Sequence, residues 1–257
     1  MAVILMPYKI KACGRSHKGL VRQNNEDAWE EVSHARFFAL ADGMGGHQAG
    51  EVAAREAVSV LCRIIEEKAH QAGHPTSLSG ARRELRHAIE LANFHVYKMG
   101  RNNSDLRGMG TTICSLYFHD QGVVYAHVGD SRIYRLRNGA FDQLTRDDSL
   151  LRELIDQGQL DEGQSSEFLY KNIITKAVGA EPSIEPCVHC VDLVDGDVFL
   201  MCTDGLTDML SDEEIAQVLA KAETVEEGAD KLVEEAIAKG GFDNITTVVL
   251  KVVRDDE

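Results

Sequence analysis

Acidic side chains occur at the ends of strand-like segments in several places along this chain. Asp42 follows an apolar run and precedes Gly43, and Asp204 repeats the same arrangement before Gly205. A carboxylate beside a glycine can present both its oxygens and a neighbouring backbone carbonyl to a ligand. The acids at such positions, or directly beside one another, are Glu26, Asp27, Asp42, Asp130, Asp204 and Asp243.

Carboxylates gathered at one point repel one another unless they are protonated or neutralised by divalent cations. A ligand set made only of oxygens favours Mg²⁺ or Mn²⁺, whereas Zn²⁺ favours histidine and cysteine. None of the ten histidines has HxH or HExxH spacing. The spacing therefore leaves two interpretations open: a shared site for hard cations, or unrelated residues of turns and helix caps.

Charge and composition narrow the class of protein. The 257 residues are 44% hydrophobic and carry a formal net charge of -15, which argues against nucleic acid or an anionic membrane as partner. The same charge would repel phosphate groups unless bound divalent cations reversed the field locally. No apolar run is long enough to span a bilayer, and the first residues lack the basic region of a secretory signal. We expect a cytoplasmic protein.

Hydrophobic periodicity predicts a mixed chain of mainly antiparallel strands with paired helices. The expected strands cover residues 8–13, 29–41, 111–118, 123–128, 132–136, 191–203 and 245–253. The expected helices cover residues 53–65, 85–99, 150–155, 212–221 and 225–239. We expect one domain over residues 1–257, with a more polar flap at about 146–180.

Cys187 and Cys190 have CxxC spacing, but the sequence contains no second CxxC to complete a zinc site. Positions three apart on an extended strand also face opposite sides of the sheet. The sequence therefore favours six reduced thiols with no function for this pair.

Eight sequence fragments, in order, resemble the metal-dependent phosphatases of the protein phosphatase 2C family, and most closely their bacterial branch. They are RxxNED (22–27), LADGMGGHxxGE (40–51), GMGTT (108–112), VGDSRIY (128–134), LTRDDS (144–149), ITKAVG (174–179), LMCTDGLTDML (200–210) and FDNITTVVL (242–250). The resemblance implies an α+β fold: a four-layer αββα sandwich of two antiparallel sheets flanked by helix pairs. It also implies two Mn²⁺ or Mg²⁺ ions in one site, with a third in bacterial relatives.

The resemblance assigns roles to individual residues. Asp42 would bridge two metals, the Gly43 carbonyl would bind one of them, and Asp204 and Asp243 would bind the other. Arg22 would hold the substrate phosphate, because a planar guanidinium donates two parallel hydrogen bonds.

Four further residues are implied to assist that site. Glu26 and Asp27 match an acidic pair that reaches the metals through their waters or lies close to them. Asp130 matches the acid that helps to hold the third metal, and Asn244 would orient Asp243.

The implied reaction is hydrolysis of phosphoserine and phosphothreonine in proteins by a water activated between two divalent metals. It would reverse signalling by a bacterial Ser/Thr kinase, and we expect a monomer. Met44 stands where eukaryotic members carry a histidine, so the proton donor is either a metal-bound water or His47. Asp148 stands before Ser149 where many bacterial members carry a histidine, so the substrate preference of relatives does not transfer.

Two other functions compete with this interpretation. A binding module on the same fold would have lost turnover, but such members lack metal ligands and this chain keeps them all. A hydrolase of small phosphorylated metabolites would need a pocket for them, and the sequence has no Walker-type loop for a nucleotide.

Overall fold

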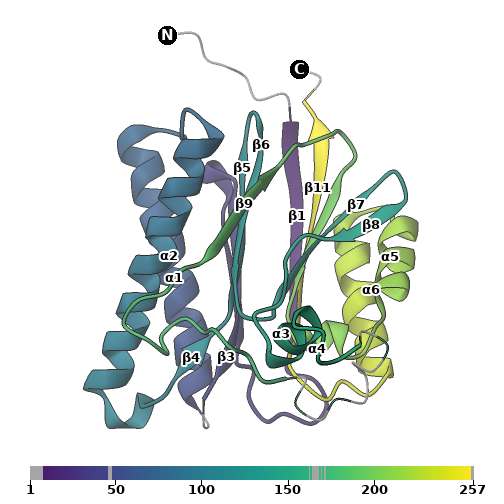
Figure 1. Ribbon diagram of the computed structural model, residues 1–257. Helices are drawn as coiled ribbons and strands as arrows, with labels where there is room; N and C mark the ends of the chain where they lie inside the picture. The colour runs from purple at the N-terminus through teal and green to yellow at the C-terminus, as the bar shows by residue number, and fades with distance from the viewer. Residues whose placement is uncertain are drawn as a thin grey trace.

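The computed structural model describes residues 8–45, 48–161, 163, 168, 170 and 172–255. Within these residues two antiparallel sheets pack face to face, and helices cover their outer faces (Figure 1). The predicted four-layer αββα sandwich is therefore confirmed. One sheet has the strand order β1 (Tyr8–His17), β11 (Ile245–Arg254), β10 (Val198–Cys202), β7 (Arg132–Arg137) and β8 (Ala140–Gln143). The other has the order β2 (Asp27–Val32), β3 (Phe37–Met44), β5 (Ile113–His119), β6 (Gly122–Val128) and β9 (Cys187–Val191), with β4 (Gly110–Thr111) paired to β3.

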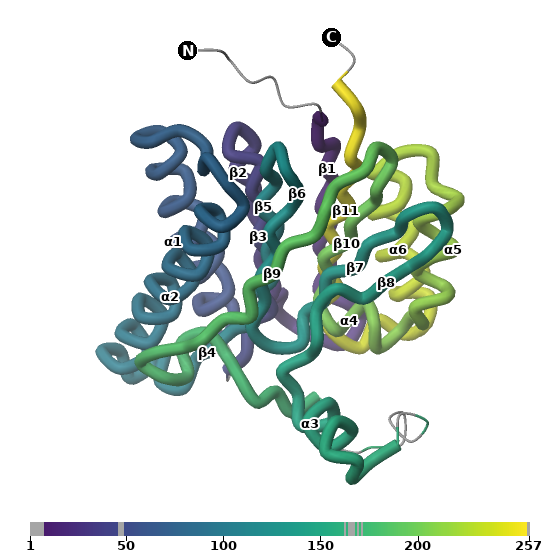
Figure 2. Tube along the Cα trace, turned by 45° about the horizontal axis from the view of Figure 1, so that its top comes forward, coloured from purple at the N-terminus to yellow at the C-terminus, as the bar shows by residue number. Residues whose placement is uncertain are grey.

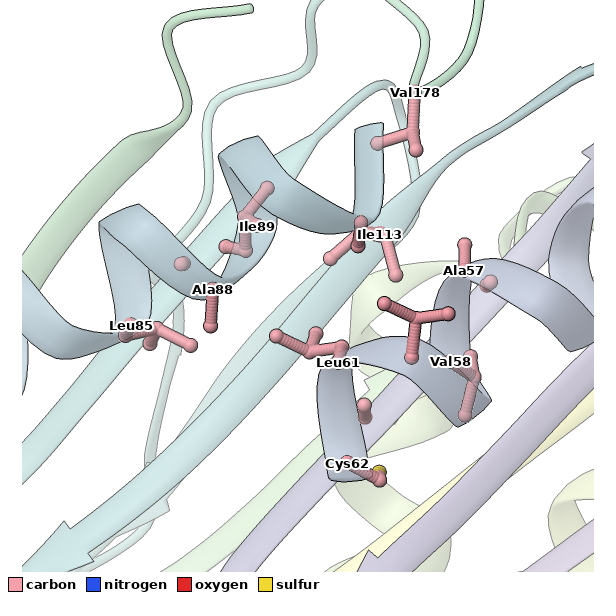
Figure 3. Close-up of a cluster of buried hydrophobic side chains, with 14 of the residues drawn as sticks. Ala57, Val58, Leu61, Cys62, Leu85, Ala88, Ile89, Ile113 and Val178 are labelled. Atoms are coloured by element: carbon pink, nitrogen blue, oxygen red, sulfur yellow. The ribbon is translucent and has the colours of Figure 1, made fainter. Parts of the chain in front are cut away.

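Two long helices, α1 (Gln48–Ala72) and α2 (Leu78–Asn102), cover the β2–β9 sheet. Their apolar residues recur at helical spacing, so one face of each helix is buried. Figure 3 shows Leu61 of α1 and Ile89 of α2 in the same cluster as Ile113 of β5. Burial of this face fixes the helix pair on the sheet.

Three helices cover the other sheet: α4 (Asp204–Thr207), α5 (Asp212–Lys221) and α6 (Val225–Ala238). A capping box begins α5, because Ser211 and Glu214 each accept a hydrogen bond from the other's backbone N–H. Thr224 likewise caps α6 by accepting from the Glu227 N–H at 3.1 Å. The predicted starts of α5 and α6 therefore agree with the structure, whereas α1 and α2 extend beyond the predicted 53–65 and 85–99.

The inner layer of the sandwich follows from strand alternation. Phe37 packs beneath the helices, whereas its neighbour Phe38 points between the sheets. There Phe118 of β5 meets Phe199 of β10 edge-on, with ring centroids 5.7 Å apart. This aromatic contact joins the two sheets.

Two predicted strands were too long. The segment 29–41 is divided into β2 and β3 by a 3-10 turn, η1 (Ser33–Ala35), after which Arg36 adopts a left-handed φ of 53°. The segment 191–203 is interrupted between β9 and β10, where Asp197 accepts hydrogen bonds from Arg137 and the Val194 N–H. Apolar content alone did not reveal these breaks, because turn formation depends on local backbone conformation and polar partners.

The hairpin between β7 and β8 turns at Asn138 and Gly139, both at positive φ. Asn-Gly is typical of such a hairpin turn, but the strands expected from the sequence did not include β8. β8 is a short, largely exposed edge strand, so it lacks the apolar pattern on which strand prediction depends.

The segment after β8 leaves the sandwich and carries the short helix α3 (Leu150–Asp156), as Figure 2 shows. Ser149 caps α3, and the isolated bridges Ser149–Ile174 and Thr111–Val178 return the segment to the body of the protein. Residues 162, 164–167, 169 and 171 of the expected flap lie outside the described residues.

Among the residues that the structure describes, no helix combines the length and apolar character that a bilayer span requires.

We predict that Leu85→Ala lowers the free energy of unfolding by about 2–5 kcal/mol, because the fully buried side chain leaves a cavity between α2 and the sheet. Leu91→Ala, on the same helix but 41% exposed, should change it by less than about 0.5 kcal/mol. Urea denaturation followed by circular dichroism measures both. Equal losses in the two variants would contradict the assigned buried face.

Candidate active site

One end of the sandwich brings together the acids that the sequence singled out. It is the end opposite the start of β1 and the end of β11 (Figure 1), where β3 ends and β11 begins. A pocket of about 250 Å³ opens there. Its lining residues are Arg22, Glu26, Asp42, Gly43, Met44, Gly45, Thr112, Asp130, Asn172, Ile174, Asp204, Asp243 and Asn244.

The backbone of Asp42 is fixed on both sides. Its N–H donates to Thr112 Oγ1 at 2.8 Å, and its carbonyl accepts from the Thr112 N–H at 2.8 Å and from Thr111 Oγ1 at 2.7 Å. Thr112 Oγ1 in turn lies 2.7 Å from Ser131 Oγ. These contacts hold the Asp42 carboxylate at the pocket, near the end of the buried strand β3.

Gly43 allows the closest backbone approach in the site. A Cβ at this position would overlap the Gly50 carbonyl in α1. The Gly43 N–H donates to the Glu26 carbonyl at 3.1 Å, and Gly43 lines the pocket beside Asp42. Only glycine permits this packing.

Asp27 lies opposite Asp42 in the β2–β3 register but does not line the pocket. Its Oδ2 accepts hydrogen bonds from Thr203 at 3.0 Å and Thr246 at 2.6 Å, which lie directly after β10 and within β11 of the other sheet. Its Oδ1 is buried and has no hydrogen-bond partner among the described residues. Burial raises the pKa of Asp27 to about 7, opposed by the two threonine hydrogen bonds.

Asn244 joins the segment before β2 to the start of β11. Its side-chain nitrogen donates to the carbonyls of Lys18 at 3.0 Å and Asn24 at 2.9 Å, and its oxygen accepts from the Glu26 N–H at 2.7 Å. The Asn244 N–H also donates to Asp243 Oδ1 at 2.7 Å. Asn244 thus orients the Asp243 carboxylate and also holds the backbone of Glu26 in place.

Arg22 contributes a guanidinium to the lining of the pocket. It donates to Asp243 Oδ2 at 2.7 Å, and its side chain is 55% exposed. A guanidinium has five N–H donors, so this contact leaves donors for an anion in the pocket.

The pKa values of the pocket acids are raised by burial and by mutual repulsion. Burial, followed by the charges of Asp27 and Asp204, raises the pKa of Asp42 well above its usual range. Burial, with Asp208 and Asp243, raises the pKa of Asp204 to about 6. Burial and Asp204 raise the pKa of Asp130 to about 7. Such carboxylates gain most from a divalent cation.

The donor set fits hard divalent cations. The acids that surround the pocket offer oxygens alone, and no histidine or cysteine is among the described lining residues. Asp42 and Asp204 lie within hydrogen-bond contact of each other, and Asp130 and Asp243 line the same pocket. Several carboxylates around one pocket suit two ions that share a ligand.

Of the sequence-predicted residues, Arg22, Glu26, Asp42, Gly43, Asp130, Asp204, Asp243 and Asn244 line the pocket and Asp27 lies behind it, while His47 is outside the described residues. Sequence reasoning missed the supporting threonines Thr111, Thr112, Thr203 and Thr246. Each lies within one of the eight fragments that resemble the family, which is the signal that could have found them.

Comparison with known families identifies the chain. The model of the family described as protein phosphatase 2C matches residues 13–239. The chain belongs to the protein phosphatase 2C family.

Bacterial members of the protein phosphatase 2C family resemble it along most of its length. It is 36% identical over 247 residues to the serine/threonine protein phosphatase PstP of Mycobacterium tuberculosis, covering 96% of this chain and 46% of that protein. The chain thus spans about half the length of this relative. It is also 36% identical to the serine/threonine phosphatase stp of Listeria monocytogenes, covering 94% of each.

Solved protein phosphatase 2C structures share the fold closely. The phosphatase PstP/Ppp of Mycobacterium tuberculosis superposes with a TM-score of 0.87 at 34% identity, covering 96% of this chain and 99% of that one. The catalytic domain of PstP in complex with two manganese ions gives a TM-score of 0.84 at 35% identity, with the same coverage. The second structure contains the number and kind of ions that the oxygen-lined pocket suits.

We predict that the metal-free protein loses thermal stability as pH rises from about 4 to about 7. Asp27 has a folded-state pKa of about 7, above its ordinary value of about 3.9, so ionisation over this range disfavours the folded state. Melting temperatures in EDTA should therefore fall with pH, and Asp27→Asn should reduce the fall.

The exposed Asp105→Asn provides the control and should keep the wild-type slope. Saturating Mn²⁺ should raise the melting temperature more at pH 8 than at pH 5, because cation ligands must be ionised. Identical slopes for wild type and Asp27→Asn would contradict the raised pKa of that carboxyl.

Proposed function

We propose that this chain is a Ser/Thr protein phosphatase that depends on Mn²⁺ or Mg²⁺. The observation that carries the proposal is one pocket in which Asp42, Asp204 and Asp243 lie with Arg22, on a chain of this family. Its substrates are phosphorylated proteins, such as those of a bacterial Ser/Thr kinase. We further propose that it acts as a monomer in the cytoplasm.

Asp42, the Gly43 carbonyl, Asp204 and Asp243 are the residues that would hold two ions. Asp130 would contribute to a third, and Glu26 and Asp27 would hold waters around them. When bound, such ions polarise a phosphoryl oxygen and lower the pKa of a water so that it can attack phosphorus. The remaining steps fall to the side chains of the chain itself.

Arg22 would bind the phosphate and hold phosphorus in line for attack. Its contact with Asp243 fixes the guanidinium at the pocket mouth while leaving other N–H donors for phosphoryl oxygens. The negative charges of Asp42 and Asp204 repel the phosphate group of the substrate. The Arg22 guanidinium offsets this repulsion and positions the phosphate at the mouth of the pocket.

The leaving serine or threonine oxygen requires a proton. Met44 lines the pocket and carries none, and no histidine is among the described lining residues. The proton therefore comes from a water in the pocket or from His47, the two donors that the sequence left open.

An exposed apolar rim beside the pocket supports a polypeptide substrate over a small metabolite. Leu20, Val21 and Phe242 are 64%, 61% and 61% exposed, and the Leu20 N–H donates to the Gly241 carbonyl at 2.8 Å. The rim therefore combines two chain segments that directly precede Arg22 and Asp243. It can contact the side chain that neighbours a phosphorylated residue.

The segment 146–180 supports the proposed flap on a single phosphatase domain. Asn172 and Ile174 line the pocket, while α3 of the same segment lies away from the sandwich. A flap that forms a wall of the pocket can influence which phosphoproteins enter.

We predict that Asp42→Asn reduces Mn²⁺-dependent phosphate release from a phosphothreonine peptide by at least about 10³-fold. Metal-ion catalysis contributes several kcal/mol, and each 1.4 kcal/mol is about tenfold in rate. Phosphate release is measured with and without Mn²⁺, alongside circular dichroism to verify folding. Asp105→Asn should retain full activity, and full activity in Asp42→Asn would refute the proposal.

We predict that Phe242→Ala lowers kcat/KM about five- to tenfold for a phosphothreonine peptide with apolar flanking residues, since the lost apolar contact contributes on the order of 1 kcal/mol. Hydrolysis of p-nitrophenyl phosphate, which has no flanking chain, should be unchanged. Phe94→Ala, at an exposed phenylalanine of α2, is the matched control. An equal loss on both substrates would place Phe242 in the chemistry instead of peptide recognition.

A further inference from the structure

A second group of potential metal ligands lies outside the oxygen-lined pocket, between β6, β9 and the start of the flap segment. A ring nitrogen of His127, a carboxylate oxygen of Asp148 and the sulfur of Cys187 lie within 4.8 Å of one another. His127 and Asp148 are buried, with 2% and 8% exposure, and Cys187 is half-buried. We propose that His127, Asp148 and Cys187 form a binding site for Zn²⁺ or a similar borderline-soft divalent cation.

Strand register explains why these side chains meet. His127 of β6 pairs directly with Cys187 of β9, so both side chains project from the same face of the sheet. That face is directed between the sheets, because Cys114, which pairs with His127 on the other side, lies in the inner cluster. Cys190 is exposed and lies three residues further along β9. The CxxC pair is therefore divided, and Cys187 has His127 as its neighbour.

The hydrogen bonding of His127 prepares it to bind a metal. Its Nε2 lies 2.7 Å from the Arg146 carbonyl, which can only accept, so Nε2 carries the proton and donates. Its Nδ1 then keeps a lone pair, and this buried atom has no hydrogen-bond partner among the described residues. Burial also lowers the pKa of His127 and keeps the ring neutral. Metal-binding histidines typically donate their other ring N–H to a carbonyl in this way.

Asp148 supplies the anionic oxygen and connects the site to the flap. Its Oδ2 accepts from the Gly129 N–H at 3.2 Å, and its Oδ1 lies 3.2 Å from Lys176 Nζ. The Lys176 side chain is 45% exposed and can swing into solvent when a cation takes its place. Lys176 keeps its proton, whereas the Cys187 thiol releases one on binding as its thiolate becomes a ligand.

Ligand chemistry separates this site from the pocket. Imidazole and thiolate ligands select Zn²⁺ and its analogues, whereas carboxylates and carbonyls suit Mg²⁺ and Mn²⁺. Zn²⁺ holds nitrogen at about 2.0–2.1 Å and sulfur at about 2.3 Å, so ligand atoms in a tetrahedral site are about 3.3–3.8 Å apart. The three atoms here lie within 4.8 Å of one another, so small side-chain movements would bring them to that spacing. The fourth tetrahedral position is left for a solvent molecule. A bound ion would tie β6 and β9 to the first residues of the flap segment.

Co²⁺ serves as the probe, because it occupies zinc sites and a bound thiolate gives it a charge-transfer absorption in the near ultraviolet. The full chain is titrated with Co²⁺ in excess Mg²⁺, which fills the oxygen-lined pocket. We expect the absorption in wild type and in the matched control Cys190→Ser, and its loss in Cys187→Ser and His127→Gln. Absence of the band from wild type, or its presence in folded Cys187→Ser, would overturn the site.

A further variant, Lys176→Met, should strengthen Co²⁺ binding, whereas Cys187→Ser and His127→Gln should abolish it. Removing the ammonium that competes for Asp148 should lower the Co²⁺ concentration at half-saturation by up to about fivefold, the strength of an exposed ion pair. An unchanged or higher midpoint would show that Asp148 is not a ligand and would overturn the three-residue site. Both readouts are independent of phosphate release, so they stand whether or not the chain is a phosphatase.

Discussion

Mutual repulsion of half-buried carboxylates is the constraint on which the active site depends. Asp42 and Asp204 have pKa values above their ordinary range because burial and their acidic neighbours disfavour the charged forms. Without cations, the protein can relieve this repulsion only by protonation, and with cations the same carboxylates become ligands. The supporting hydrogen bonds therefore hold the acids in place at a cost in stability, as expected for a functional site.

The sandwich makes this arrangement possible because its two sheets contribute acids to the same end. Asp42 comes from the sheet covered by α1 and α2, while Asp204 and Asp243 adjoin strands of the other sheet. Asp27 joins the halves, since its Oδ2 accepts hydrogen bonds from Thr203 and Thr246 across the sandwich. The site therefore requires the sheets to be packed correctly, and the aromatic contact between them contributes to the geometry of the acids.

Helical spacing alone located α1 and α2. The four layers and the pocket residues were predictable from the resemblance to the protein phosphatase 2C family, because the spacing of the aspartates by itself left open whether they share a site. The role of Asp27 as a link between sheets was not predictable, because its threonine partners are 176 and 219 positions away in the chain. The break before β3 depends on the left-handed Arg36, a conformation that its residue type does not favour. Contacts between residues far apart in the sequence, and unusual backbone conformations, can be identified only in the folded structure.

The pairing of Cys187 with His127 has the same origin, because it depends on the register of β6 with β9 and not on CxxC spacing. Asp148 connects this part of the sheet to the pocket. Its carboxylate holds the Gly129 N–H, and Asp130 is the next residue and lines the pocket. The Asp148 carboxylate places a negative charge at the start of the flap, and Lys176 is its ion-pair partner. A bound cation would compete with the Lys176 ammonium for this carboxylate. Flap and pocket therefore share one backbone contact, through which charge at Asp148 can act on Asp130.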